Sequence, residues 1–190
     1  TSYLVKFGKM FQFIFPKKIQ NMMELMPTSF PDKTLKVKEK YPAKGKKIAR
    51  VALLTGCVQK ELSPQINEST IRLLNRHGVE VVVPKKIRCC GSLNHHLGKE
   101  TDANSDFVNN IETWYEEHKK GNLDAILSNT SGCGTTLKDY GFIFRNDKKL
   151  KDKAKKISEL SKDVTEYLSQ SLKLKIKKKN KKYKIAYHSA

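Results

Sequence analysis

Short apolar runs alternate with longer amphipathic segments through the middle of the chain. IARVALLTG begins at Ile48, VEVVVP begins at Val79 and LDAILS begins at Leu123. Runs of this length that end in glycine, proline or polar residues are typical of strands buried on both faces of a parallel sheet. The order strand, helix, strand, helix, strand, helix predicts an α/β fold, a small parallel sheet with flanking helices.

Helix signals lie between these runs. Ser63 and Pro64 are typical of an N-cap and a first helical position, and His77-Gly78 closes the helix. The apolar positions in between recur with helical spacing, at Ile66, Ile71, Leu73 and Leu74. A second helix is predicted over 102–120, where Trp114 is interpreted as a core residue, and a long polar helix over 149–172.

The two ends of the chain differ from this central part. Residues 1–27 carry an amphipathic helical pattern, at Leu4, Phe7, Met10 or Phe11 and Ile14, which Pro16 interrupts. We expect this helix to dock on a neighbouring domain; the alternative is a membrane-surface helix, which its polar face, not densely basic, favours less. Residues 27–47 are interpreted as a linker, and 183–187 as the start of another strand.

The net charge of the chain bears on which kinds of molecule it could bind. The 38 basic and 19 acidic residues give a net charge of +19, and nearly all the basic residues are lysine. Base reading and bidentate phosphate contacts favour arginine, so we interpret the charge as a lysine-rich solvated surface and expect no nucleic acid partner. An acidic protein partner remains compatible with this surface.

The chain contains no apolar stretch of about 20 residues and no secretory signal pattern at its first residues. We therefore expect a cytoplasmic protein with reduced cysteines, long enough to bury a core without disulfides.

The candidate chemistry lies in four cysteines. Cys57, Cys89, Cys90 and Cys133 each follow the end of a predicted strand, on loops. Because the carboxyl ends of parallel strands meet at one edge of a sheet, residues far apart in sequence are expected to converge there.

The spacing of the cysteines bears on what they bind. Structural zinc sites usually show two C-x2-4-C pairs, and this chain has none. The adjacent Cys89 and Cys90 suit a multi-iron cluster, which takes neighbouring thiolates on different irons. Zinc, which would make the chain a zinc-stabilised basic binding module, and ordinary buried thiols remain open as alternatives. A thiol–disulfide redox pair lacks a C-x-x-C motif.

Four glycines each flank one of these cysteines, and histidines follow the adjacent pair. Gly56, Gly91, Gly132 and Gly134 permit positive φ and close passage of the backbone beside an inorganic group. His95 and His96 are candidates for a ligand or a proton donor, and equally for a capping or packing role.

Three motifs, TGCVQ, CCGSLNHHLG and NTSGCGTTLKDYG, carry a family resemblance over roughly Arg50 to Tyr140. Together they resemble the cysteine-rich (CCG) domain of glycolate oxidase iron–sulfur subunits. The same domain type occurs in heterodisulfide reductase and in lactate-utilisation proteins. The adjacent Cys-Cys-Gly between two single cysteines makes the match specific.

The resemblance implies a subunit that passes electrons from a flavin-containing dehydrogenase subunit, which oxidises glycolate, to a quinone or other acceptor. It implies contact with the inner face of the membrane. Cys57, Cys89, Cys90 and Cys133 are carried over as ligands of an iron–sulfur cluster, expected to be 4Fe–4S. Thr136 stands where the heterodisulfide reductase version of the motif has a further cysteine.

The resemblance also suggests that the chain is a fragment. Family members would be expected to begin with a ferredoxin-like domain and to contain a second cysteine-rich domain. The expected organisation is an N-terminal helix and linker over 1–47, the first cysteine-rich domain over 48–147 and a helix with a Lys-rich connector over 148–182. Residues 183–190 would begin a truncated second cysteine-rich domain.

Overall fold

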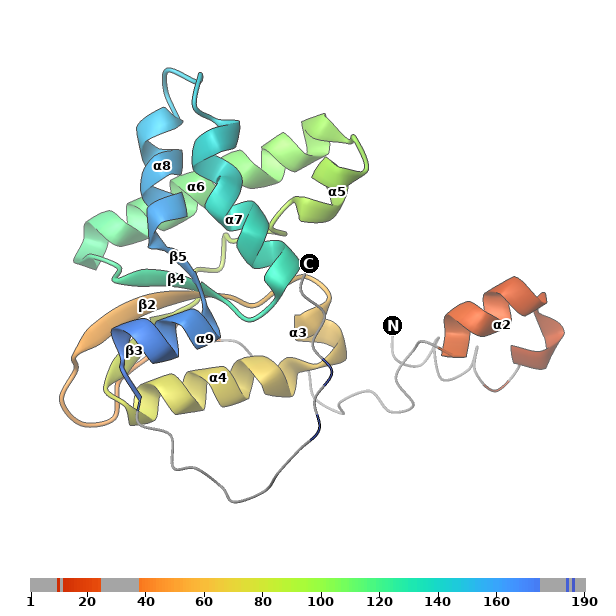
Figure 1. The fold of residues 1–190 in the computed structure, drawn as a ribbon, viewed down its shortest axis with the longest axis horizontal. Helices are drawn as coiled ribbons and strands as arrows, with labels where there is room; N and C mark the ends of the chain where they lie inside the picture. Colours follow the sequence, from red (N-terminus) through yellow and green to blue (C-terminus); the bar gives the residue numbers. More distant parts are fainter. Residues whose placement is uncertain (1–9, 11, 25–37, 175–183, 185, 187–190) are drawn as a thin grey trace.

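The fold is built on a five-stranded sheet in the order β1-β3-β2-β4-β5 (Figure 1). The computed structural model describes residues 10, 12–24, 38–174, 184 and 186. β1 pairs antiparallel with β3, and every other neighbouring pair is parallel. The predicted α/β class with a parallel sheet and flanking helices is confirmed. The strands are β1 Lys40–Tyr41, β2 Ala49–Leu54, β3 Val79–Val82, β4 Ala125–Ser128 and β5 Ser161–Asp163.

Helices cover both faces of this sheet. In Figure 1, α5, α6, α7 and α8 lie on one side of it, and α4 and α9 lie on the other. The helical elements are η1 Gln12–Ile14, α2 Lys17–Glu24, α3 Gln59–Leu62, α4 Pro64–Arg76, α5 Ser92–His96, α6 Glu100–Gly121, α7 Ser131–Ile143, α8 Lys151–Leu160, α9 Val164–Glu166 and the π turn η2 Tyr167–Ser171.

Alternation along the strands divides the core into two halves. In β2, Ala52 and Leu54 pack with α6, α7 and α8, whereas Val51 and Leu53 pack on the α4 side. Successive side chains of a strand point to opposite faces, so a continuously apolar strand needs helices on both sides. Trp114 is fully buried in the first half, which confirms its predicted packing role.

The chain order places a topological switch beside β2. From β2 the chain runs through α4 to β3 on one side, and from β3 through α6 to β4 on the other side. Connections that leave in opposite directions open a crevice at the carboxyl ends of the strands, which is where α/β proteins assemble their sites.

The helix predicted over 149–172 is wrong in part. α8 ends at Leu160, and residues 161–163 form β5, which pairs with β4 at the edge of the sheet. Asp163 then caps α9: its side chain accepts a hydrogen bond from the N–H of Thr165, and Glu166 completes a capping box. The polar edge strand has no apolar alternation, so the sequence pattern did not reveal it.

Other local predictions have mixed outcomes. α4 begins at Pro64 and ends before His77-Gly78 as predicted, but the side chain of Ile66 is exposed and does not belong to the core. Pro16 separates η1 from α2, as expected of a helix breaker. Two residues of the predicted N-terminal pattern, Leu4 and Phe7, lie outside the described residues. Of the strand predicted over 183–187, only residues 184 and 186 are described.

The sheet also draws on both segments that flank 48–147, because β1 precedes that range and β5 follows it. Within the described part of the chain, no helix has the length and apolar character needed to cross a membrane.

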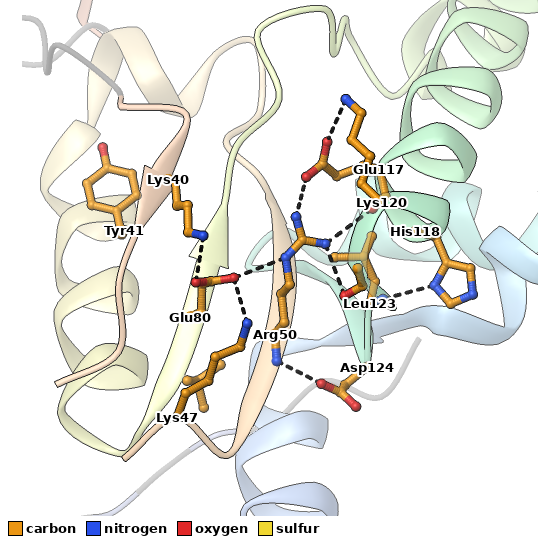
Figure 2. Close-up of polar contacts among 12 residues, drawn as sticks. Lys40, Tyr41, Lys47, Arg50, Glu80, Glu117, His118, Lys120, Leu123 and Asp124 are labelled. Atoms are coloured by element: carbon orange, nitrogen blue, oxygen red, sulfur yellow. Dashed lines mark hydrogen bonds and ion pairs between the residues drawn. The ribbon is translucent and has the colours of Figure 1, made fainter. Parts of the chain in front are cut away.

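An ion-pair network centred on the buried side chain of Glu80 lies at the edge of the sheet opposite the cysteines (Figure 2). Glu80 on β3 accepts hydrogen bonds from Lys47 at 2.9 Å and from Arg50 on β2 at 3.0 Å, and pairs with Lys40 at 3.0 Å. Arg50 also pairs with Glu117 of α6. Although burial opposes the effect, Lys47 and Lys40 hold the pKa of Glu80 below its ordinary value. The network ties β1, β2, β3 and α6 together.

Candidate metal centre

All four cysteines line one cavity of about 530 Å³ at the carboxyl edge of the sheet. They lie as two pairs: the Sγ atoms of Cys57 and Cys89 are 3.5 Å apart, and those of Cys90 and Cys133 are 3.1 Å apart. Cys57 is exposed, Cys90 is buried and the other two are intermediate. The convergence expected from the strand order is therefore present, and each of the two adjacent cysteines faces a different distant one.

The backbone places Cys133 differently from the prediction. Cys57 follows β2 and the adjacent pair follows β3, both outside regular helix, but Cys133 lies in the first turn of α7, not on a loop. The loop between β4 and α7 is only two residues long, Asn129 and Thr130. A thiolate in the first turn of a helix is favoured by the helix dipole.

Burial and neighbouring thiols shift the pKa values of Cys57, Cys90 and Cys133. Burial, followed by the neighbouring Cys89 thiol, raises the pKa of Cys57. The hydrogen bond to Cys133, together with burial, raises the pKa of Cys90, and the same bond lowers the pKa of Cys133. The backbone N–H groups of Val58 and Ser92 act in the opposite direction on Cys57 and Cys90, because they donate toward sulfur. Donors of this kind also stabilise sulfur bound to a metal.

Two of the four flanking glycines have the predicted conformation. Gly56 has φ +71° and Gly91 has φ +79°, a region that favours glycine. Gly132 and Gly134 lie inside α7 and have no positive φ, so that part of the prediction is wrong. Open space beside Gly132, where a β carbon would meet nothing within 4 Å, is still compatible with close passage beside a bound group.

A polar network joins the strand ends that carry Cys57 and Cys133. The Nε2 atom of Gln59 donates to Asn67 at 2.9 Å and to Asn129 at 2.7 Å. Asn67 donates in turn to the carbonyl of Thr55 at 2.8 Å, and Thr130 donates to Gln59 at 3.0 Å. These bonds fix the loop after β2 against the loop after β4, and so fix the two single cysteines relative to each other.

Sequence reasoning did not identify these positioning residues. Gln59 lies in the TGCVQ motif with Cys57, and Asn129 lies in the NTSGCG motif with Cys133. Asn110 and Tyr140, which bind the backbone of the adjacent cysteines, are fully buried on α6 and α7. A polar residue on the apolar stripe of a helix was the available signal for Asn110.

His95 and His96 have different surroundings. The ring of His95 packs edge-on against Phe107 with centroids 5.7 Å apart, which supports the packing interpretation. His96 lines the cysteine cavity and a second, adjacent cavity of about 710 Å³. Neither belongs to a compact set of ligands in the described part of the chain.

The mouth of the cysteine cavity is apolar. Val58, Leu62, Ile66 and Leu93 line it, and all four side chains are exposed to solvent. Apolar walls lower the local dielectric and restrict water around a bound group, which are the means by which proteins adjust its potential.

The donor set fits a thiolate-bound cluster better than a single ion. Among the described residues, no group of three or more His, Cys, Asp or Glu side chains gathers closely enough to hold one metal ion. A zinc site would bring four ligands to one point, so the two separate thiol pairs give the zinc alternative no support. Four cysteine sulfurs around one cavity match the ligand count of an iron–sulfur cluster.

Thr136 lies outside this set. It is buried one turn after Cys133 in α7, and its Oγ1 donates to the carbonyl of Gly132 at 3.1 Å. Thr136 lines the adjacent cavity rather than the cysteine cavity.

Comparison with known proteins agrees with this geometry. Residues 51–138 match a family model described as a cysteine-rich domain, CCG. The glycolate oxidase iron–sulfur subunit of Escherichia coli K12 is 36% identical over 165 residues, which cover 87% of this chain and 40% of that protein. The probable glycolate oxidase iron–sulfur subunit of Bacillus subtilis 168 is 26% identical over 156 residues, 82% of this chain and 34% of that protein.

Another relative has a different name. Lactate utilization protein A of Bacillus subtilis is 28% identical over 119 residues, which cover 63% of this chain and 48% of that protein. The chain thus spans less than half the length of each of these relatives. No solved structure matches it.

Proposed function

Because residues 51–138 belong to the cysteine-rich CCG family, we propose that this chain is part of the iron–sulfur subunit of an oxidoreductase and carries one cluster on Cys57, Cys89, Cys90 and Cys133. The observation that carries the proposal is the gathering of these four thiols, from three separate strand ends, around one cavity. Similarity to the named iron–sulfur subunits supports it.

The expected role is electron transfer within a complex. When bound, a cluster of this kind supplies a one-electron carrier. In this proposal a flavin-containing dehydrogenase subunit oxidises glycolate or a related 2-hydroxy acid and passes electrons to this subunit, which passes them to a quinone or other acceptor. The similarity to glycolate oxidase subunits and a lactate utilization protein supports this class of substrate.

The residues of the chain have distinct tasks in this role. The cysteines bind as thiolates, Cys133 from the first turn of α7 and Cys89 and Cys90 from the turn after β3. The N–H groups of Val58 and Ser92 donate toward sulfur and reduce the charge that accumulates there. Val58, Leu62, Ile66 and Leu93 form an apolar border that a partner subunit would cover, excluding water from the cavity.

Anaerobic reconstitution tests the cofactor. Incubation of the chain with ferrous iron and sulfide should give a coloured protein with about four iron atoms per chain, as expected for a 4Fe–4S cluster. The control is the same incubation with zinc alone. A protein that stays colourless with iron and sulfide but binds zinc tightly would overturn the proposal.

Electron transfer is tested separately. The reconstituted protein should be bleached by a reduced flavin-containing 2-hydroxy acid dehydrogenase and should not be bleached by glycolate alone. Bleaching by glycolate without the flavoprotein would contradict the assignment of substrate chemistry to the partner.

A further inference from the structure

The turn that carries the adjacent cysteines is held from its buried side by two polar side chains. The Nδ2 atom of Asn110, on α6, donates to the carbonyl of Cys89 at 2.7 Å. The hydroxyl of Tyr140, on α7, donates to the carbonyl of Cys90 at 2.9 Å. Each of the two cysteines thus has its own hydrogen-bond donor from a different helix.

Asn110 extends this contact to the preceding residue. Its Oδ1 atom accepts a hydrogen bond from the N–H of Arg88 at 2.9 Å, and its Nδ2 atom lies 3.5 Å from the hydroxyl of Tyr140. The backbone of three consecutive residues, Arg88, Cys89 and Cys90, is therefore bound by these two side chains. The bound groups include the carbonyl of the peptide bond that joins Cys89 to Cys90 and the carbonyl of the next peptide bond.

The side chains of Asn110 and Tyr140 are buried polar groups, which need hydrogen-bond partners. Both side chains are fully buried, and Tyr140 packs in the same core cluster as Phe107, Ile111 and Leu137. A buried amide or hydroxyl is unfavourable unless it is hydrogen-bonded, and leucine or phenylalanine would fill the same space. The hydrogen bonds to the carbonyls of Cys89 and Cys90 therefore explain why polar side chains occupy these two buried positions.

The direction of the two thiols depends on this turn. Cys89 faces Cys57 and Cys90 faces Cys133, with sulfur separations of 3.5 Å and 3.1 Å. Rotation of the peptide between the two cysteines would move both sulfurs at once. Hydrogen bonds to both carbonyls oppose that rotation, so the distribution of the two thiols between the two sides of the cavity is fixed from the core.

We propose that Asn110 and Tyr140 are positioning residues for the cluster, which act through the carbonyls of Cys89 and Cys90 to hold the adjacent thiolates in their binding directions. The inference rests on the proposed function, since it assigns a purpose to a turn whose cysteines bind the cluster. Hydrogen-bond partners that orient metal ligands affect metal affinity or activity when they are removed.

The test compares four variants of the whole chain after reconstitution with iron and sulfide. Tyr140→Phe and Asn110→Leu each remove one donor to the turn. Tyr167→Phe and Asn75→Leu are matched controls: Tyr167 is buried in the other half of the core, and Asn75 donates to the carbonyls of Val79 and Tyr41 away from the cysteines. The measurements are the rate of iron loss to a chelator and the electron paramagnetic resonance spectrum of the reduced protein.

Tyr140→Phe and Asn110→Leu should lose iron about 10-fold faster than the wild type and show an altered spectrum. The controls should keep the wild-type rate and spectrum, even where they lower the melting temperature. Wild-type rates and spectra in Tyr140→Phe, with folding intact, overturn this role and leave the proposed function standing. If Asn110→Leu does not fold, Tyr140→Phe decides alone. A wild-type chain that assembles no cluster overturns the proposed function and this role with it.

Discussion

Gly91 lies directly against the ring of Phe107. A β carbon at position 91 would lie 2.3 Å from Cε1 of Phe107, closer than real contacts allow, and the backbone of Gly91 has φ +79°. Phe107 is fully buried and also contacts His95 and Tyr140, with ring centroids 5.7 Å and 4.9 Å away. The residue after the adjacent cysteines is therefore restricted to glycine by its conformation and by the space available.

Gly91→Ala is expected to destabilise the chain by about 2 to 5 kcal/mol, which combines left-handed strain with overpacking against Phe107. Gly98→Ala is the matched control, because Gly98 has φ +72° but open space around its β position. The control should cost only about 1 to 2 kcal/mol. Urea unfolding of both variants measures the difference, and equal losses would show that the ring of Phe107 moves aside without cost.

Glu80→Gln is expected to lower stability at pH 7 by about 2 kcal/mol, since it leaves three cations near a neutral side chain. The pKa of Glu80 is below its ordinary value of 4.5, so its contribution is fully present above pH 4.5. The contribution is lost as the pH falls through the lower pKa of the folded state. Melting temperatures from pH 7 to pH 3 should therefore converge for wild type and variant only at the acidic end.

The exposed pair of Glu68 and Arg72 supplies the control for that series. Glu68→Gln should change the melting temperature little at any pH, because exposed pairs contribute about 0 to 1 kcal/mol. A gap between wild type and Glu80→Gln that stays constant down to pH 3 would contradict the assignment to Glu80.

Cys57→Ser should abolish cluster assembly, or reduce the iron retained severely, because the four cysteines include no spare thiolate. Folding should be affected little, since the side chain of Cys57 is exposed. Val58→Ser alters the next residue on the same cavity wall and should retain iron. Iron and sulfide content after anaerobic reconstitution checks both variants, and an intact cluster in Cys57→Ser would show that the proposed ligand set is wrong.

Thr136→Cys restores the further cysteine of the heterodisulfide reductase version of the motif, yet it is expected to leave iron content and spectrum unchanged. The side chain of Thr136 lines the cavity next to the cysteine cavity and bonds back to Gly132. Thr135→Cys, at an exposed position, controls for the added thiol. Additional iron in Thr136→Cys alone would show that α7 can turn this position toward the cysteines.

Local patterns predicted the central elements because local physics decides them. Runs such as VEVVVP form strands that must be covered on both faces, and Pro64 and Gly78 fit the two ends of α4 for steric reasons. The same reasoning failed at 161–163, where a polar edge strand interrupts a helical pattern. It failed also at Cys133, where the helix begins within the glycine-containing segment interpreted as loop.

The sequence by itself determined the α/β class, the three central strands and the meeting of four cysteines at one edge of the sheet. These features follow from the hydrophobic periodicity and from the order of the strands, and both can be read directly from the sequence. Only the tertiary structure decided which thiols pair, that Asn110 and Tyr140 bind the turn between them, and that Phe107 excludes a side chain at Gly91. Those contacts join residues that are 16 to 50 positions apart, and their geometry exists only once the helices have packed.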